Sequence, residues 1–335
     1  MTDLLKTIIT CFFLARICAV AQAQVAKKPI RTVDSSSMTE RGAKLAETGH
    51  CQEALPLLKR SFTQTSDKDL KLRTGIDAVR CAMSLNQADL AVDFLRMLNR
   101  EFPRSPEVLY LSVHIYSDLS TRASQELANM APTSYQARQL NAEALEVQGK
   151  WDEAEKEYRK ILEDNPRTPG IHFRLGRNVL SKPETPTTAE DAKKEFEAEL
   201  EIDPTNAGAE YVLGELAREA GQMPEAVEHF TRATRLDAAF GDAFLGLGIA
   251  LIAERKYSDA IPPLETAVKL QPGNPAGHYN LAIAYGREGR KEDAQREAAL
   301  QKATAEKIEQ EKQKAADAMQ KPSSVGEGQK PEPPK

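Results

Sequence analysis

Apolar and polar positions follow a helical period from Met38 to about Lys321. The clearest stretch, residues 149–166, combines a turn glycine, an amphipathic helix and a terminal proline. Four alanines at the same place in later stretches are spaced by 34, 34 and 34 residues: Ala192, Ala226, Ala260 and Ala294. A fixed period of this length is the signature of a solenoid of stacked repeats. We therefore predict an all-α fold built from helix pairs.

The pattern can be placed eight times along the chain. The repeats cover about 35–68, 72–105, 106–134, 135–168, 169–206, 207–240, 241–274 and 275 onward. They are degenerate over 38–134 and regular over 135–300. In the third repeat, a first helix at Val108–Leu119 is followed by a short second helix that ends at Pro132. The fifth has four extra residues within 181–188, and its two prolines predict a surface protrusion.

Most repeats have a small residue at position 8 of the first helix and an alanine at position 20 of the second helix. Small residues at these places let two antiparallel helices approach closely, and a large apolar residue at position 24 fills the space beside them. A proline near position 32 stops the second helix. One helix pair cannot bury its own apolar face, so we expect neighbouring pairs to stack.

The amino terminus has the layout of a secretory signal. Lys6 precedes a short apolar run, and Ala21-Gln22-Ala23 fits the small-residue cleavage pattern. Residues 1–23 would then be removed, and residues 24–37 form a flexible linker. We expect an exported protein, periplasmic or extracellular. An acidic residue in the basic region and an arginine in the apolar core depart from the layout, so a cytoplasmic protein is the alternative.

The carboxyl end contains one more long helix. It runs on after Ala294 without glycine or proline, and we expect residues 301–321 to cap the last repeat with a polar outer face. A coiled-coil handle is the alternative, but the apolar positions do not keep the required heptad seam. Residues 322–335 are rich in proline and polar side chains and predict a disordered tail.

Cleavage of the signal would leave two cysteines, Cys51 and Cys81. They lie at the start of one predicted helix and within the next but one, so they could meet across adjacent repeats. In an oxidising compartment this even pair permits a disulfide. The alternative is that both are small buried apolar residues.

Composition and motifs argue against several functions. The net charge of −5 is mild and both signs are interleaved, so there is no basic stripe for nucleic acid. The five histidines are scattered, and we find no metal-binding, nucleophile-elbow or phosphate-loop motif. We expect no catalysis, no cofactor, no metal and no small-molecule substrate.

The repeats resemble the tetratricopeptide repeat family, whose period is 34 and whose signature runs W-x2-L-G-x2-Y…A-x3-F…P. The matching residues include Leu175-Gly176, Leu213-Gly214, Leu247-Gly248, Ala154/Tyr158/Pro166, Ala192/Phe196/Pro204, Ala226/Phe230 and Ala260/Leu264/Pro272. The first-helix tryptophan is absent, Ala238 replaces a terminal proline, and Glu199 occupies a usually small apolar place. The resemblance implies a right-handed superhelical solenoid that binds a protein or peptide on its concave face.

In the family, positions 2, 5, 9 and 12 of the first helices line the concave groove. Carried onto this chain, the resemblance implies a groove with aromatic, aliphatic and arginine side chains: Phe173, Arg177, Tyr211, Arg218, Leu245, Ile249, Ile252, Tyr279 and Ile283. Such residues are enriched in binding hot spots. The alternative is that they pack against neighbouring first helices as core. The family's carboxylate clamp is absent, because its places hold Phe173, Arg177, Asp242 and Gly246.

We therefore expect a non-catalytic interaction scaffold that binds a peptide or partner protein in this groove, with peripheral envelope association as a further expectation. The alternative is a structural or oligomeric component of a cell-envelope assembly or secretion machine. No set of residues in the sequence suggests an enzyme, since repeat folds without an added domain supply packing surfaces rather than a catalytic site.

Overall fold

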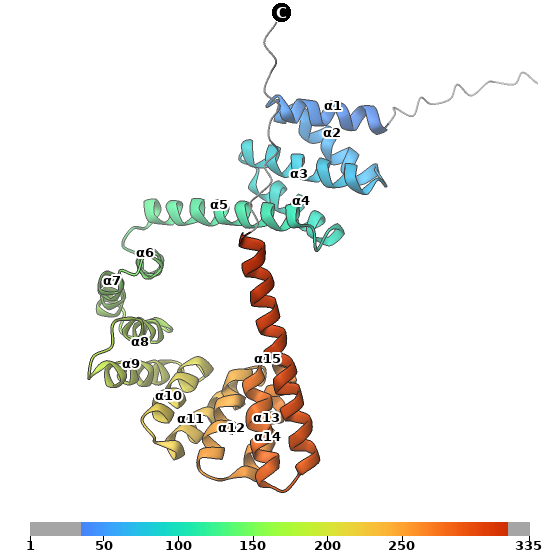
Figure 1. Cartoon of the computed structure of the whole chain (residues 1–335). Coiled ribbons are helices and arrows are strands. Elements are labelled where there is room, and N and C mark those ends of the chain that lie inside the picture. The colour runs from blue at the N-terminus through green and yellow to red at the C-terminus, as the bar shows by residue number, and fades with distance from the viewer. Residues whose placement is uncertain (1–34, 321–335) are drawn as a thin grey trace, which may run out of the picture. The chain divides into compact units, whose positions relative to one another are not determined.

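The computed structural model describes residues 35–320, and every regular element in that range is an α-helix (Figure 1). The all-α prediction is confirmed. The predicted signal (1–23) and the predicted tail (322–335) lie outside the described residues. The predicted linker (24–37) also lies outside them, except that Ser35–Ser37 already belong to the first helix. The helical array therefore starts slightly before the predicted Met38.

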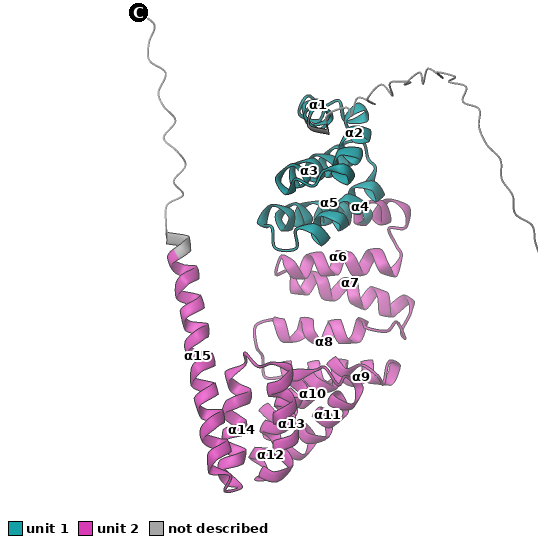
Figure 2. Cartoon of the chain, turned by 90° about the vertical axis from the view of Figure 1, so that its right-hand side faces the viewer, with its two compact units in different colours: residues 1–123 teal, residues 124–335 magenta. Residues whose placement is uncertain are grey.

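The chain divides into two compact units, residues 1–123 and 124–335 (Figure 2). The described part of unit 1 contains α1 (Ser35–Glu47), α2 (Cys51–Gln64), α3 (Lys68–Ser84), α4 (Ala88–Glu101) and most of α5 (Pro106–Met130). One continuous core joins these helices, with Leu58, Phe94 and Leu98 fully buried in it. The division falls inside α5.

Unit 2 holds the regular repeats and buries a smaller core within each helix pair or between neighbouring pairs. Its helices are α6 (Tyr135–Val147), α7 (Trp151–Asp164), α8 (Ile171–Ser181), α9 (Thr188–Ile202), α10 (Ala207–Glu219), α11 (Met223–Leu236), α12 (Gly241–Ala253), α13 (Tyr257–Leu270), α14 (Pro275–Arg287) and α15 (Lys291–Gln320). The last is continuous from the second helix of the eighth repeat, as the pattern beyond Ala294 predicts.

The third repeat differs from its prediction. Instead of a first helix that ends at Leu119 and a short second helix, α5 runs unbroken from Pro106 to Met130. No glycine or proline interrupts this segment, and Asp118 forms an ion pair with Arg122 one turn later, 3.0 Å away, where the turn was expected. The third repeat therefore has no second helix of its own.

The extra residues of the fifth repeat are held against the neighbouring repeat. Lys182 directly follows α8, and its Nζ lies 2.6 Å from Oδ1 of Asp152 and 2.5 Å from Oε2 of Glu155. Both carboxylates belong to α7, in the repeat before. The predicted protrusion is thus anchored at its start by two ion pairs.

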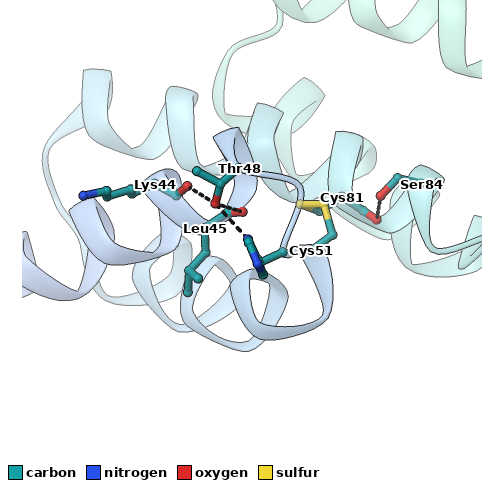
Figure 3. Close-up of a disulfide and its surroundings, with 7 residues drawn as sticks. Lys44, Leu45, Thr48, Cys51, Cys81 and Ser84 are labelled. Atoms are coloured by element: carbon teal, nitrogen blue, oxygen red, sulfur yellow. Dashed lines mark hydrogen bonds between the residues drawn. A yellow bond between two sulfur atoms is a disulfide. The ribbon is translucent and has the colours of Figure 1, made fainter.

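Cys51 and Cys81 form a disulfide in unit 1 (Figure 3). Cys51 is the first residue of α2 and Cys81 lies in the last turns of α3, so the bond joins consecutive helices and not the next but one. The pairing is across adjacent repeats, since α2 closes the first repeat and α3 opens the second. Both cysteines are buried.

In unit 2, the two helices of a pair approach each other at a point where a small residue on one helix faces a large residue on the other. A Cβ atom added at Gly176 would lie 2.7 Å from the ring of Phe196, and one added at Gly214 would lie 2.8 Å from the ring of Phe230. These glycines occupy position 8 of their first helices, and the rings belong to the second helices of the same repeats. The close approach that the pattern predicts is therefore direct contact.

A substitution at Gly248 tests this contact, because a Cβ atom added there would overlap the side chain of Leu264. We expect Gly248→Val to lower the free energy of unfolding by about 1–3 kcal/mol, and Leu264→Ala in the same chain to recover part of the loss. Urea denaturation followed by circular dichroism measures both. Gly273→Ala is the control, since a Cβ at Gly273 meets no atom within 4 Å. Equal effects of the two glycine substitutions would contradict the contact.

Candidate partner-binding groove

Unit 1 contains a groove of about 910 Å³ between α3, α5 and the end of α1. Its lining residues are Glu47, Arg73, Ile76, Asp77, Arg80, Pro106, Glu107, Tyr110, Leu111 and His114. A volume of this size lies within the range of ligand-binding clefts. We call it the unit-1 groove.

The lining residues come from a repeated place on two first helices. Positions 2, 5 and 9 of the second repeat are Arg73, Ile76 and Arg80. The same positions of the third repeat are Glu107, Tyr110 and His114. The family resemblance assigns these positions to a concave groove. The sequence prediction missed these residues because the pattern before the fourth repeat is degenerate, and the register of the first helices could have found them.

The walls of the groove combine apolar and aromatic surface. Ile76 is half-buried and Leu111 is buried, so they form part of the floor. Tyr110 is 69% exposed, and its ring meets the ring of His114 edge-on with the centroids 4.3 Å apart. An exposed tyrosine over an apolar floor is a common anchor in protein interfaces.

Two arginines flank a carboxylate on the wall formed by α3. Arg73, Asp77 and Arg80 are four and three residues apart, so they share one face of the helix. Both arginines are exposed, and among the described residues neither guanidinium forms a hydrogen bond or a close ion pair. Their interaction with Asp77 is through space. Both cations are therefore free to meet a ligand.

The carboxylates of the groove differ in their surroundings. Burial raises the pKa of Asp77 above its usual value, Arg80 and Arg73 lower it by a smaller amount, and Glu47 raises it. The hydroxyl of Ser105 donates a hydrogen bond of 2.6 Å to Glu107, which lowers the pKa of that exposed carboxyl. The folded protein therefore disfavours the charged form of Asp77, in contrast to that of Glu107.

A raised carboxyl pKa makes the fold more stable at low pH than at high pH. The contribution of Asp77 is complete below the unfolded-chain pKa of about 3.9 and is lost as the pH rises through the folded-state pKa. We expect Asp77→Asn to be more stable than the parent at neutral pH and equal to it below about pH 4. Denaturant midpoints across that range measure the difference. A variant that is less stable at neutral pH would show that the two arginines outweigh burial.

The residues predicted for a groove in unit 2 are divided between packing and solvent. The ring centroids of Phe173 and Phe196 are 5.5 Å apart, and those of Tyr211 and Phe240, the residue just before α12, are 4.9 Å apart. Leu245 and Ile252 pack against a buried cluster. These four therefore contribute to contacts within and between repeats.

The remaining predicted residues of unit 2 are more accessible. Tyr279 is 57% exposed and Arg177 is exposed, whereas Ile249 and Ile283 are half-buried. Arg218 is paired with Glu215, with Nη2 and Oε2 2.6 Å apart. Binding at this surface stays a prediction.

Three of the scattered histidines contact a glutamate across the two helices of a repeat. In each, Nδ1 lies 2.7 Å from a glutamate oxygen on the other helix of the same repeat: His172 and Glu195, His229 and Glu210, and His278 and Glu297. In the sixth repeat the histidine and the glutamate have exchanged helices. These histidines therefore join helix pairs.

The acidic, histidine and cysteine side chains are spread along the array. Among residues 35–320, no cluster of three or more of them could hold a metal ion. Within the same described range, every helix is too short or too polar to cross a bilayer.

Three segments match family models that are described as tetratricopeptide repeats: residues 137–178, 189–240 and 251–315. All three lie in unit 2 and fall on consecutive helix pairs of the regular array. Unit 2 is built of tetratricopeptide repeats. The small-to-large contacts of Gly176, Gly214 and Gly248 lie within or next to these matches and show why the repeat signature holds there.

Several known proteins are similar to part of the chain. A peroxisomal targeting signal receptor from Yarrowia lipolytica is 33% identical over 75 residues, which are 22% of this chain and 12% of the receptor. The solved structure of MamA is 22% identical and covers 50% of this chain and 96% of its own, with a TM-score of 0.46. YrrB, described as a tetratricopeptide repeat protein with an unusual peptide-binding site, is 20% identical and covers 54% and 92%, also with a TM-score of 0.46.

Proposed function

We propose that this chain is a non-catalytic interaction scaffold that binds an extended peptide segment of a partner protein in the unit-1 groove. The observation that carries the proposal is the pair of exposed arginines, Arg73 and Arg80, beside the exposed ring of Tyr110. Backbone carbonyls and carboxylates of a peptide suit the guanidinium groups, and an apolar side chain suits the floor. The tetratricopeptide repeats of unit 2 favour the same general role.

The first-helix surface of unit 2 is the second candidate site. Tyr279 and Arg177 support it because both are exposed on first helices. It ranks below the unit-1 groove for one reason. The resemblance assigns Phe173 and Tyr211 to this surface, but the rings of both residues pack against other aromatic rings of the array. A structural role in a cell-envelope assembly is the alternative function, and no described contact favours it over peptide binding.

Site-specific photo-crosslinking in intact cells tests the proposal. A photoreactive residue at Tyr110 should give a discrete adduct with a partner. Arg73→Glu should abolish this adduct, because the groove would lose one of the two cations that bind the peptide. Arg96→Glu is the matched control, since Arg96 is exposed on α4 outside the groove. Both arginines are on the surface, so neither change should alter the helical circular dichroism.

The outcomes separate the two candidate sites. An adduct at Tyr279 with none at Tyr110 would place binding on unit 2 and contradict the unit-1 groove. An adduct at Tyr110 that survives Arg73→Glu would contradict the role of the arginines. No adduct at either place would leave the structural alternative as the better account.

We also propose that the chain is exported, with cleavage after Ala23, and that it has a peripheral association with the envelope. The Cys51–Cys81 disulfide supports export, because disulfides persist mainly in oxidising compartments. The prediction is an amino-terminal sequence that begins at Gln24, together with no alkylation of either cysteine when cells are lysed in a thiol-alkylating reagent without reductant. A retained Met1 with both thiols alkylated would indicate a cytoplasmic protein.

A further inference from the structure

In the complete repeats, the second helix covers one face of the first helix. Positions 4, 8 and 11 of the first helix lie on this face. At position 4, Glu210 is 5% exposed and His278 is 3% exposed, and at position 11 Ala217 and Tyr285 are 4% and 3% exposed. Position 8 is the small residue that the large side chain of the second helix contacts. In the sixth repeat this face is therefore buried, and in the other repeats of unit 2 it is buried or half-buried.

The same face of α5 is bare. Leu109, Val113 and Tyr116 occupy positions 4, 8 and 11 of the third repeat, and they are 49%, 68% and 47% exposed. Their spacing of four and three residues places them on one side of the helix. We call these three residues the α5 stripe. An apolar stripe on a soluble helix marks an interaction surface when nothing else covers it.

Among residues 35–320, no segment supplies a second helix for the third repeat. Only residues 131–134 join α5 to α6, which already opens the fourth repeat. Position 8 of the third repeat is Val113, where the fifth, sixth and seventh repeats have Gly176, Gly214 and Gly248 and the second repeat has Val79.

We propose that the α5 stripe is the contact surface of a homodimer, in which α5 of a second copy lies antiparallel on it. Antiparallel packing is the arrangement of helix pairs in this array. A two-fold axis at Val113 brings Val113 against its own copy and Leu109 against Tyr116, so that each side presents the same stripe. Two valines then meet at the place where the fifth, sixth and seventh repeats have a glycine against a large side chain.

The charges along α5 fit contact with a second copy. Residues 108–117 contain no Asp, Glu, Lys or Arg, and His114 is the one titratable side chain other than tyrosine among them. Like charges therefore do not oppose each other across the two-fold axis. His114 lies in the unit-1 groove against Tyr110 and is not part of the stripe. The dimer surface and the groove are thus different faces of α5.

Disulfide crosslinking at the axis tests the dimer. The two cysteines within residues 1–23 are first replaced, as Cys11→Ser and Cys18→Ser, so that they cannot crosslink. In this full chain a Val113→Cys substitution should form an intermolecular disulfide under mild oxidation, because the axis brings the two residues 113 together. Met130→Cys is the control, since Met130 is on the same helix and 77% exposed. The two residues 130 of the dimer would lie about 50 Å apart, at about 1.5 Å of rise per residue.

Light scattering over a concentration series provides the second measurement. The parent should approach twice the mass of one chain, and Val113→Asp should remain at the mass of one chain with unchanged helical circular dichroism, because residue 113 is exposed in the single chain. Equal crosslinking at residues 113 and 130 would reflect random collision and overturn the proposal. A parent that stays monomeric at all concentrations would overturn it as well, whether the stripe is covered by the rest of its own chain or by another protein.

Discussion

The close contact between a small residue on one helix and a large residue on the next is the constraint on which the repeats of unit 2 depend. Gly176, Gly214 and Gly248 leave no room for a Cβ because Phe196, Phe230 and Leu264 fill that space. The contact sets the distance between the helices of a pair, and so determines which other side chains can meet across it. A single pair buries too little surface to be stable alone, so the same constraint leads to stacking.

Other contacts of the repeat are more tolerant. The histidine–glutamate pair appears in either direction, as His278 with Glu297 and as Glu210 with His229. The hydrogen bond between histidine and glutamate keeps its geometry when the two residues exchange helices. The contact between a glycine and a phenylalanine is less tolerant, because the two helices cannot approach as closely when both residues are large. The turn between paired helices is similarly permissive, since Asn86 and Arg255 adopt the left-handed conformation that glycine adopts in other repeats.

The third repeat lacks the pairing that organises the others. With no helix breaker near Leu119, α5 continues as one helix, and the face that its partner would have covered remains exposed. The division between the two compact units falls within this helix. Its groove face still lies beside α3 and carries Tyr110 into the unit-1 groove. The missing turn therefore leaves an accessible apolar surface on α5.

The sequence by itself determined the helix pairs of unit 2 and their spacing, because glycine, alanine and proline act through the backbone and recur every 34 residues. It could not locate the unit-1 groove, since Arg73 and Tyr110 belong to different helices and become neighbours only when repeats with a weak pattern stack. Nor could it decide whether Phe173 and Tyr211 face a ligand or the next helix, because both are large, apolar in part and placed at the same repeat position. The tertiary structure decided these points, since burial depends on what lies opposite a side chain and not on the period at which it recurs.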